Sequence, residues 1–428
     1  MINFLGKGVS IWDTLAHSKP DPIANNGTGD VACDSYHKWN DDIQLIKNMG
    51  VKYYRFSISW PRILPNGLKS GGINPDGIRY YRNLIDNLVA SGINPMVTIY
   101  HWDLPQHLQD YGGWLNSSIV DWYTDYADLC YQTFGDKVKY WITFNEPLTF
   151  INLGYGSGVF APRIGNCAGT CPYIATHNVV KAHAAAWHKY NNTYRSSQKG
   201  KVGITNNMNW IYAGTNRSED VAAQDRALQW GLGRFTHPIF SKTGDYPEVM
   251  KVVIANRSKA AGLNMSRLPA FTPDEIKYIR GTYDFFGLNM YTSSICYNRI
   301  DNNINDQNIF ADEQTFCNIS TNWGSSGSSW LKFTPDGIRQ LLKWIKNEFD
   351  NPPVIITENG WSDKNGSISD TWRVHYYKQY INNVLKARLL DGVNVIGYTG
   401  WSLMDNLEWL AGYTEYFGLH AVNMTDPN

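Results

Sequence analysis

Short hydrophobic runs alternate with longer amphipathic runs along most of the sequence. The short runs occupy residues 52–57, 94–100, 138–144, 201–205, 284–288, 354–357 and 395–399. Helix-like stretches lie between them, for example at 35–49, 75–91, 119–134, 174–194, 335–349 and 371–390. The short runs are apolar on both faces, which is typical of a parallel sheet that is covered by helices. Over 428 residues, this pattern predicts an α/β fold, a TIM (β/α)8 barrel with insertions.

The number of strands differs from that of a complete barrel. Seven runs qualify as strands, and residues 1–33 offer no convincing eighth. A parallel barrel that lacks one strand has two edges with unpaired N–H and C=O groups. We therefore expect an incomplete barrel, without its first strand and its last helix. No Pro- or Ser-rich linker divides the chain, so we expect one domain over residues 1–428, with the polar run 302–329 as a long loop.

Composition excludes several classes of protein. Lys plus Arg and Asp plus Glu both number 38, so the chain lacks the basic excess of a nucleic-acid-binding protein. No stretch approaches the roughly 20 apolar residues of a membrane-spanning helix. The 17 Trp and 27 Tyr residues fit either a bulky core or aromatic platforms in a pocket.

Six cysteines are too few to form a disulfide framework in a chain of this length. Cys33, Cys130, Cys296 and Cys317 are isolated in the sequence, and we expect them to be buried thiols. Cys167 and Cys171 lie close together in a loop-like run and could form a small disulfide. Zinc binding with His177 is the alternative, but no second pair of ligands follows, so we expect no metal.

The sequence leaves two cellular locations open. Nine N-x-[S/T] sequons favour a secreted glycoprotein, although an Asn-rich chain contains several by chance. The first eight residues lack the apolar region of a signal peptide. Either the protein is cytoplasmic, or it is secreted and its natural start lies upstream of Met1.

Polar and aromatic residues follow nearly every predicted strand. Two of them, Glu146 and Glu358, come directly after hydrophobic runs. The carboxyl ends of barrel strands converge on one face, where active sites are built. Two neighbouring carboxyl groups acquire different pKa values, so one can donate a proton while the other stays ionised. Cleavage of an acetal requires this division, and indole faces would provide a surface for a sugar ring.

At these residues the chain resembles glycoside hydrolase family 1, the β-glucosidase and lactase family. The similar segments follow the family's order over essentially the whole chain. They are residues 6–13, 29–37, 54–62, 100–105, 143–147, 356–360 and 401–409. Each segment is moderately specific, and together they identify the family.

The resemblance implies a role for each site residue. Glu146 would be the general acid/base and Glu358 the nucleophile of a retaining double displacement. Arg55, Asn289 and Tyr291 would support and orient the nucleophile. The residues expected to contact substrate are His101, Asn145, Tyr291, Trp330, Trp401, Glu408 and Trp409. No cofactor or metal is implied, and the expected partner is a small β-glucoside or oligosaccharide.

Two details narrow the implied substrate. Glu146 is present where the thioglucoside-cleaving branch of the family lacks its acid, which favours O-linked glucosides. Glu408 would repel a 6-phosphate. The alternative hypothesis is a catalytically impaired, truncated family member, or a pseudoenzyme that binds sugars or a partner. The sequence leaves the oligomeric state open.

Overall fold

Seven parallel strands form the main sheet of the protein. The fold is described from a computed structural model, for residues 6–300, 303 and 306–424. The strands are β1 (Tyr53–Ser57), β2 (Asn94–Tyr100), β3 (Tyr140–Asn145), β4 (Lys201–Asn207), β6 (Phe286–Asn289), β9 (Val354–Glu358) and β10 (Val395–Tyr398). They lie in the order β1-β2-β3-β4-β6-β9-β10, and every neighbouring pair is parallel. All seven predicted strands are therefore confirmed.

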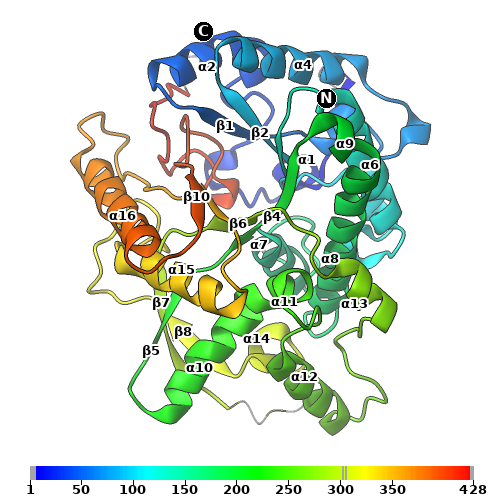
Figure 1. The fold of residues 1–428 in the computed structure, drawn as a ribbon, viewed down its shortest axis with the longest axis vertical. Coiled ribbons are helices and arrows are strands. Elements are labelled where there is room, and N and C mark those ends of the chain that lie inside the picture. The colour runs from blue at the N-terminus through cyan, green and yellow to red at the C-terminus, as the bar shows by residue number, and fades with distance from the viewer. Residues whose placement is uncertain (1–5, 301–302, 304–305, 425–428) are drawn as a thin grey trace.

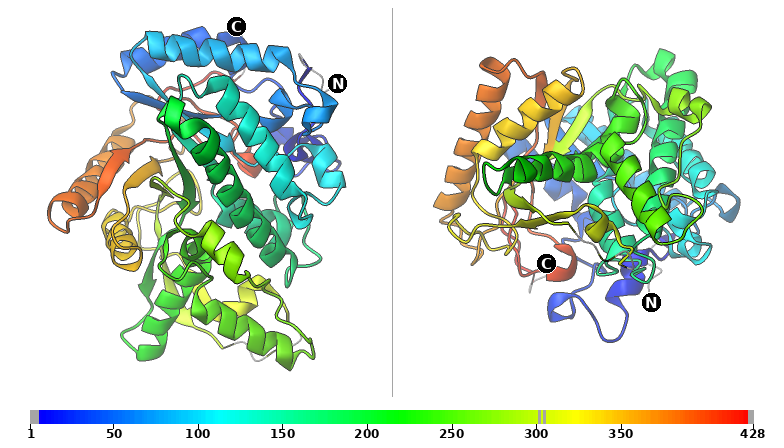
Figure 2. Two further views of the ribbon diagram at one scale, coloured as in Figure 1. Left: turned by 45° about the vertical axis from the view of Figure 1, so that its right-hand side comes forward. Right: turned by 90° about the horizontal axis from the view of Figure 1, so that it is seen from below.

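Helices surround this sheet (Figures 1 and 2). The predicted ones are α2 (Ser35–Asn48), α4 (Pro75–Ala90), α6 (Ile119–Phe134), α8 (Cys171–Lys189), α15 (Asp336–Glu348) and α16 (Thr371–Leu389). Sequence features explain their limits: Asn74 caps α4 by accepting from the Asp76 N–H, and Pro75 occupies its first position. The apolar positions of α15 fall on one face, where Ile338, Leu341, Leu342 and Ile345 are buried.

Further helices lie between these elements. The longer ones are α10 (Ser218–Leu228), α11 (Arg234–Phe240), α12 (Glu248–Ala260) and α13 (Pro273–Ile279). The shorter ones are α1 (Ile11–Ala16), α3 (Trp60–Ile63), α5 (Gln106–Asp110), α7 (Pro147–Ile151), α9 (Arg195–Gln198) and α14 (Ile309–Asp312).

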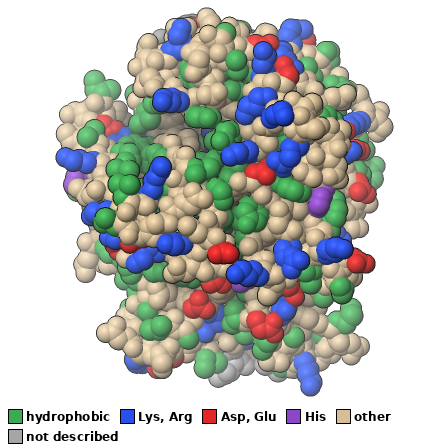
Figure 3. All heavy atoms as spheres, in the orientation of Figure 1, with side chains coloured by type: hydrophobic (Ala, Val, Ile, Leu, Met, Phe, Trp, Pro, Cys, Tyr) green, Lys and Arg blue, Asp and Glu red, His purple; other side chains and the backbone are tan. Residues whose placement is uncertain are grey.

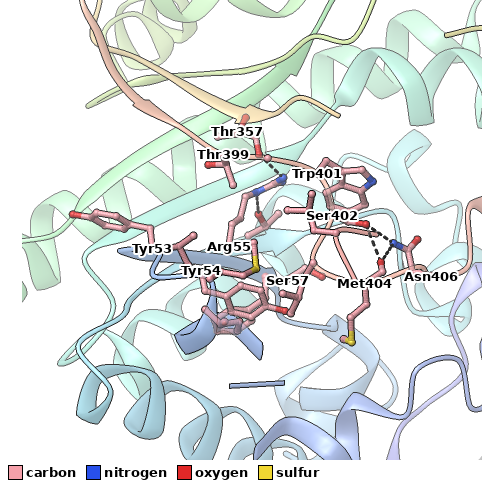
Figure 4. A pocket seen from close by; sticks show the side chains of 18 of the residues that line it. Tyr53, Tyr54, Arg55, Ser57, Thr357, Thr399, Trp401, Ser402, Met404 and Asn406 are labelled. Atoms are coloured by element: carbon pink, nitrogen blue, oxygen red, sulfur yellow. Dashed lines mark hydrogen bonds between the residues drawn. The ribbon is translucent and has the colours of Figure 1, made fainter. Parts of the chain in front are cut away.

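The curled sheet is open along one side. Within the described residues, β1 pairs with β2 and β10 pairs with β9, and no pairing joins β1 to β10. A cavity of about 640 Å³ lies between these two edges. Figure 4 shows residues of β1, such as Tyr54 and Arg55, facing Thr399 and Trp401 across it. The structure is thus an incomplete TIM barrel, as the sequence predicts.

Large apolar side chains fill the interior of the barrel and the space beneath the helices. Met96, Ile142, Phe285 and Ile355 form a compact buried cluster of their own. Gly203 allows this packing, because a Cβ there would lie 2.6 Å from the Phe285 carbonyl oxygen. Close packing of this kind makes the cluster sensitive to the loss of side-chain volume.

A second, three-stranded sheet was not predicted. It contains β5 (Trp210–Ala213), β7 (Ser293–Asn298) and β8 (Thr315–Asn318), in the order β5-β7-β8. The expectation of one long loop over 302–329 is therefore wrong in part, since α14 and β8 lie within this run. Residues 301, 302, 304 and 305 lie outside the described residues.

The expectation that Cys296 and Cys317 are free thiols is wrong. They face each other in the register of the antiparallel β7–β8 pair and form a disulfide. The sequence did not show this pairing, because the two residues are 21 positions apart and their strands were not predicted. Cys33 and Cys130 are free thiols; Cys130 is buried, as expected, whereas Cys33 is only half-buried.

The surface carries both signs of charge. In the view of Figure 3, Lys and Arg side chains are scattered among Asp and Glu, and hydrophobic side chains gather below the layer of α2 and α4. None of the helices in the described parts of the chain is long and apolar enough to cross a membrane.

Replacing Phe285 with Ala should lower the free energy of unfolding by about 3–5 kcal/mol, because a cavity would remain in the buried cluster. The matched control is Phe316→Ala on β8, where the side chain is 50% exposed and the cost should be below about 1 kcal/mol. Urea unfolding of both variants measures this difference. Equal losses for the two variants would contradict the assigned packing.

Candidate active site

The carboxyl ends of the strands bring polar side chains from distant parts of the sequence together. Asn145, Asn289 and Glu358 are the last residues of β3, β6 and β9, and Glu146 directly follows β3. Arg55 extends from the middle of β1, an edge strand. Asn145, Asn289 and Glu358 are almost fully buried. These groups form one connected set of hydrogen bonds.

Glu358 is held by two donors. Arg55 Nη1 contacts its Oε1 at 2.5 Å, and Tyr291 Oη donates to its Oε2 at 2.8 Å. Burial, followed by the charge of Glu358, raises the pKa of Tyr291 well above its usual value, so the phenol keeps its proton. A cation on one oxygen and a hydroxyl donor on the other stabilise Glu358 as a carboxylate.

Glu146 lies in a different environment. Asn289 Nδ2 donates to its Oε1 at 2.7 Å, and Thr149 Oγ1 donates to its Oε2 at 3.1 Å. Burial and, next, the charge of Glu358 raise the pKa of Glu146 to about 8. At neutral pH, Glu146 is therefore mostly protonated, and the site pairs a carboxylic acid with a carboxylate.

Hydrogen-bonding partners fix the orientation of the Asn145 amide and the tautomer of His101. Asn145 Oδ1 accepts from Arg55 Nη2 at 2.7 Å and from Asn289 Nδ2 at 3.1 Å, so its amide nitrogen faces His101. That nitrogen lies 2.9 Å from His101 Nε2, which must act as an acceptor. Burial, together with Arg55, lowers the pKa of His101 well below its usual value. His101 is thus neutral and carries its proton on Nδ1.

Three indoles form a wall next to His101. The ring of Trp409 lies 4.1 Å from that of Trp102 and 5.9 Å from His101, and the Trp401 ring lies 6.2 Å from His101. Trp102 Nε1 donates to the Asn145 carbonyl at 2.8 Å, which joins the wall to β3. The wall offers a flat apolar surface next to polar groups, which suits a sugar ring.

Local backbone strain marks the same region. Trp102, Glu146 and Trp409 have positive φ angles of 77°, 49° and 51°, which non-glycine residues rarely adopt. Such residues persist only where the surrounding structure fixes them, and they cluster at functional sites. Gly360 relieves crowding nearby, because a Cβ there would lie 2.1 Å from the Trp401 carbonyl oxygen.

The remaining predicted residues line the outer part of the site. Burial raises the pKa of Glu408 to about 8, with further contributions from Glu415, Glu358 and Glu146. The Trp330 ring lies 5.6 Å from Tyr291 and 6.3 Å from Phe417, and 39% of Trp330 is exposed. Ser328 donates a hydrogen bond to Glu415, which joins the Trp330 loop to the loop of Glu408.

The structure thus gathers the predicted site residues at one end of the sheet. Cys167 and Cys171, by contrast, form a disulfide at the start of α8. Several contributors were missed by the sequence analysis, namely Trp102, Thr149, Thr205, Asn207, Thr357 and Glu415. Thr357 is an example: it accepts from Thr205 Oγ1 and donates to Asn289 Oδ1, but it reads as an ordinary strand residue in the sequence.

The cavity between β1 and β10 adjoins this site. Arg55, His101, Thr357 and Trp401 are among its lining residues, whereas the two glutamates are not. Figure 4 shows Arg55 reaching from β1 toward Thr357. Within the described residues, no group of three or more His, Cys, Asp or Glu side chains could hold a metal ion.

Replacing Arg55 with Met should cost about 3–5 kcal/mol of unfolding free energy near pH 7.5, because the buried carboxylate of Glu358 loses its cation. Part of this cost should disappear near pH 5, where the folded variant takes up a proton that the unfolded chain does not bind. Urea unfolding at both pH values measures the effect. Arg79→Met, which removes an exposed ion pair with Asp76, is the matched control and should cost less than about 1 kcal/mol. A pH-independent cost for Arg55→Met would contradict this account of the ion pair.

Comparisons with known proteins identify the family to which this chain belongs. The family model of Glycosyl hydrolase family 1 matches residues 2–428. Human lactase/phlorizin hydrolase is 51% identical over 425 residues, which are 99% of this chain but only 22% of that protein.

Solved structures agree with the sequence match. An aphid myrosinase superposes with a TM-score of 0.93 at 42% identity, and a rice β-glucosidase (Os3BGlu6) with a TM-score of 0.93 at 40% identity. Each match covers 100% of this chain and 91% of the other. The chain therefore belongs to glycosyl hydrolase family 1 and has the TIM-barrel fold of that family in incomplete form.

Proposed function

We propose that this member of the family is a glycoside hydrolase, a retaining β-glycosidase that hydrolyses terminal, O-linked β-D-glucosides. The observation that carries the proposal is the unequal environment of its two carboxyl groups. Arg55 and Tyr291 stabilise Glu358 as an anion, whereas burial and the charge of Glu358 keep Glu146 protonated. Retaining hydrolysis needs a nucleophilic carboxylate and a carboxylic acid in one site.

In the first step, the Glu358 carboxylate attacks the anomeric carbon and forms a glycosyl ester. The bond to the leaving oxygen breaks, and Glu146 transfers its proton to that oxygen. Asn145 donates to His101 Nε2, which leaves the His101 proton on Nδ1, where it would be offered to a sugar hydroxyl. As the ester forms, Arg55 loses its anionic partner and Tyr291 loses a charged acceptor, which favours the return of the carboxylate in the second step.

In the second step, water attacks the anomeric carbon and releases the sugar from Glu358. Glu146, now ionised, takes the proton of the water. The proton given to the leaving group is thus recovered, and both glutamates return to their starting states. No further group is needed to balance this sequence of steps.

The proposed glucoside preference rests on the walls of the site and on the relatives. Trp401 and Trp409 would face the sugar ring, while Glu408 would bind its distal hydroxyls and disfavour a 6-phosphate. Relatives include a lactase/phlorizin hydrolase and β-glucosidases. One solved relative, a rice β-glucosidase mutant 40% identical to this chain, is described as a covalent complex with glucose. That description supports a covalent route here.

A second candidate function is a sugar-binding protein with impaired catalysis. The open edge between β1 and β10 favours it, since Arg55, the cation beside Glu358, extends from the edge strand β1. Movement of β1 would separate Arg55 from Glu358 without abolishing the aromatic wall.

We also propose an oxidising compartment such as the secretory route, which the two disulfides support.

Proton NMR of the first sugar released from an aryl β-D-glucoside tests the proposal. A retaining enzyme should release β-glucose before mutarotation begins. Glu358→Gln and Glu146→Gln should each lower kcat/KM by about 10²-fold or more, since each removes a group that acts in the transition state. Release of α-glucose first would contradict retention, and sugar binding without turnover by the unaltered chain would favour the second candidate.

The pH dependence of kcat/KM should follow the protonation of Glu146. Because the acid must be protonated and its pKa lies at about 8, kcat/KM should fall as the pH rises through this value. Initial rates with an aryl β-D-glucoside between about pH 5 and pH 10 measure the profile. In the Glu146→Gln variant, this descending limb of the pH profile, the fall of kcat/KM at high pH, should be absent. A limb that persists unchanged in that variant would show that another group is responsible.

A further inference from the structure

A short chain of hydrogen bonds reaches Glu146 from outside the set of predicted site residues. Thr149 lies in α7, three positions after Glu146, and its Oγ1 donates to Glu146 Oε2 at 3.1 Å. Asn207, the last residue of β4, donates from Nδ2 to Thr149 Oγ1 at 2.8 Å. Three elements of the chain therefore meet at one oxygen of Glu146.

The donors and acceptors in this chain fix its direction. An amide nitrogen can only donate, so the Thr149 oxygen must accept from Asn207. One lone pair of the hydroxyl is then occupied, which favours the donation of its single proton to Glu146. Without Asn207, the hydroxyl would be free to rotate about its C–O bond.

Each carboxyl oxygen of Glu146 has one donor of its own. Asn289 Nδ2 donates to Oε1, and Thr149 donates to Oε2. Asn289 is itself fixed, because its Oδ1 accepts from Thr357 Oγ1 at 2.7 Å. The two donors therefore fix the plane of the carboxyl group. The acidic proton is bound at a lone-pair position that neither donor uses.

We propose that Thr149, oriented by Asn207, is a positioning residue that aims the Glu146 proton at the leaving oxygen of the substrate. This inference rests on the proposed function, since it assigns the acid role to Glu146. The strained backbone of Glu146, with φ 49° and ψ 62°, makes such support necessary, because a strained residue keeps its conformation only where its surroundings fix it.

Several charged or titratable groups face Glu146 and affect its pKa together with Thr149. Glu358 at the end of β9 and Glu408 in the C-terminal loop are acidic, Arg55 on β1 is cationic, and Tyr291 after β6 is a neutral phenol. Burial and, next, the charge of Glu358 raise the pKa of Glu146. The hydrogen bonds from Asn289 and Thr149 lower it. Loss of the Thr149 hydroxyl should therefore raise this pKa further.

The test compares two substrates that differ in their need for an acid. Dinitrophenyl β-D-glucoside has a leaving group that departs without a proton, whereas the phenyl β-D-glucoside needs one. Thr149→Val should lower kcat/KM for the phenyl substrate about tenfold or more and change that for the dinitrophenyl substrate less than about twofold. The descending pH limb of Thr149→Val should lie at higher pH than that of the unaltered enzyme.

Three variants act as controls. Thr149→Ser keeps the hydroxyl and should restore the phenyl substrate to within about threefold of the unaltered enzyme. Asn207→Ala should show the same dependence on the leaving group in weaker form, since only the orientation of the hydroxyl is lost. Thr124→Val removes a half-buried hydroxyl that donates to the Val120 carbonyl in α6 and should affect neither substrate.

Two results would overturn the proposal. If Thr149→Val lowers kcat/KM equally for both substrates, or for neither, Thr149 does not act through the acid. If the unaltered chain hydrolyses the dinitrophenyl substrate and Glu146→Gln shows no dependence on the leaving group, Glu146 is not the acid. The second result contradicts the proposed function, whereas the first contradicts the role of Thr149 alone.

Discussion

The contact between Arg55 and Glu358 joins the first and the penultimate strand of the open sheet. Arg55 donates to Glu358, to the Thr357 carbonyl, to Thr98 Oγ1 and to Asn145 Oδ1. One guanidinium therefore links β1, β2, β3 and β9. Because β1 and β10 do not pair within the described residues, this buried cation provides connections across the barrel mouth that backbone hydrogen bonds do not. The geometry around Glu358 and the arrangement of the strand ends depend on each other.

The chemistry of the site follows from an asymmetry between two carboxyl groups. Glu358 has a cation and a phenol as partners, whereas Glu146 has only an amide and an alcohol. Burial and, next, the charge of Glu358 raise the pKa of Glu146, and its two neutral donors do not offset this rise, so Glu146 keeps its proton near neutral pH. The same reasoning applies to Glu408, whose neighbours include Glu415 and both site glutamates. Burial and the neighbouring groups, not the residue type, thus make the two glutamates differ.

The sequence alone predicts the main sheet well, because its inner strands β2, β3, β4, β6 and β9 are buried on both faces and appear as apolar runs. Their polar ends then identify Glu146, Glu358 and Asn289 as neighbours. The second sheet was missed because β5, β7 and β8 are partly exposed and partly polar, and Phe316 of β8 is half exposed. The Cys296–Cys317 disulfide depends on that sheet, so it was missed for the same reason. Thr149 and Asn207 lack any local pattern, since their roles arise only when α7 meets the end of β4.

Reaction of the chain with a 2-deoxy-2-fluoro-β-glucosyl trapping reagent, followed by peptide mass measurement, tests whether Glu358 is the nucleophile. The fluorine slows release of the sugar more than its attachment, so a competent nucleophile stays labelled. We expect one glucosyl adduct, on Glu358, and loss of labelling in Glu358→Gln. An adduct on another residue, or no adduct on a chain that hydrolyses aryl glucosides, would contradict the assignment of Glu358 as the nucleophile.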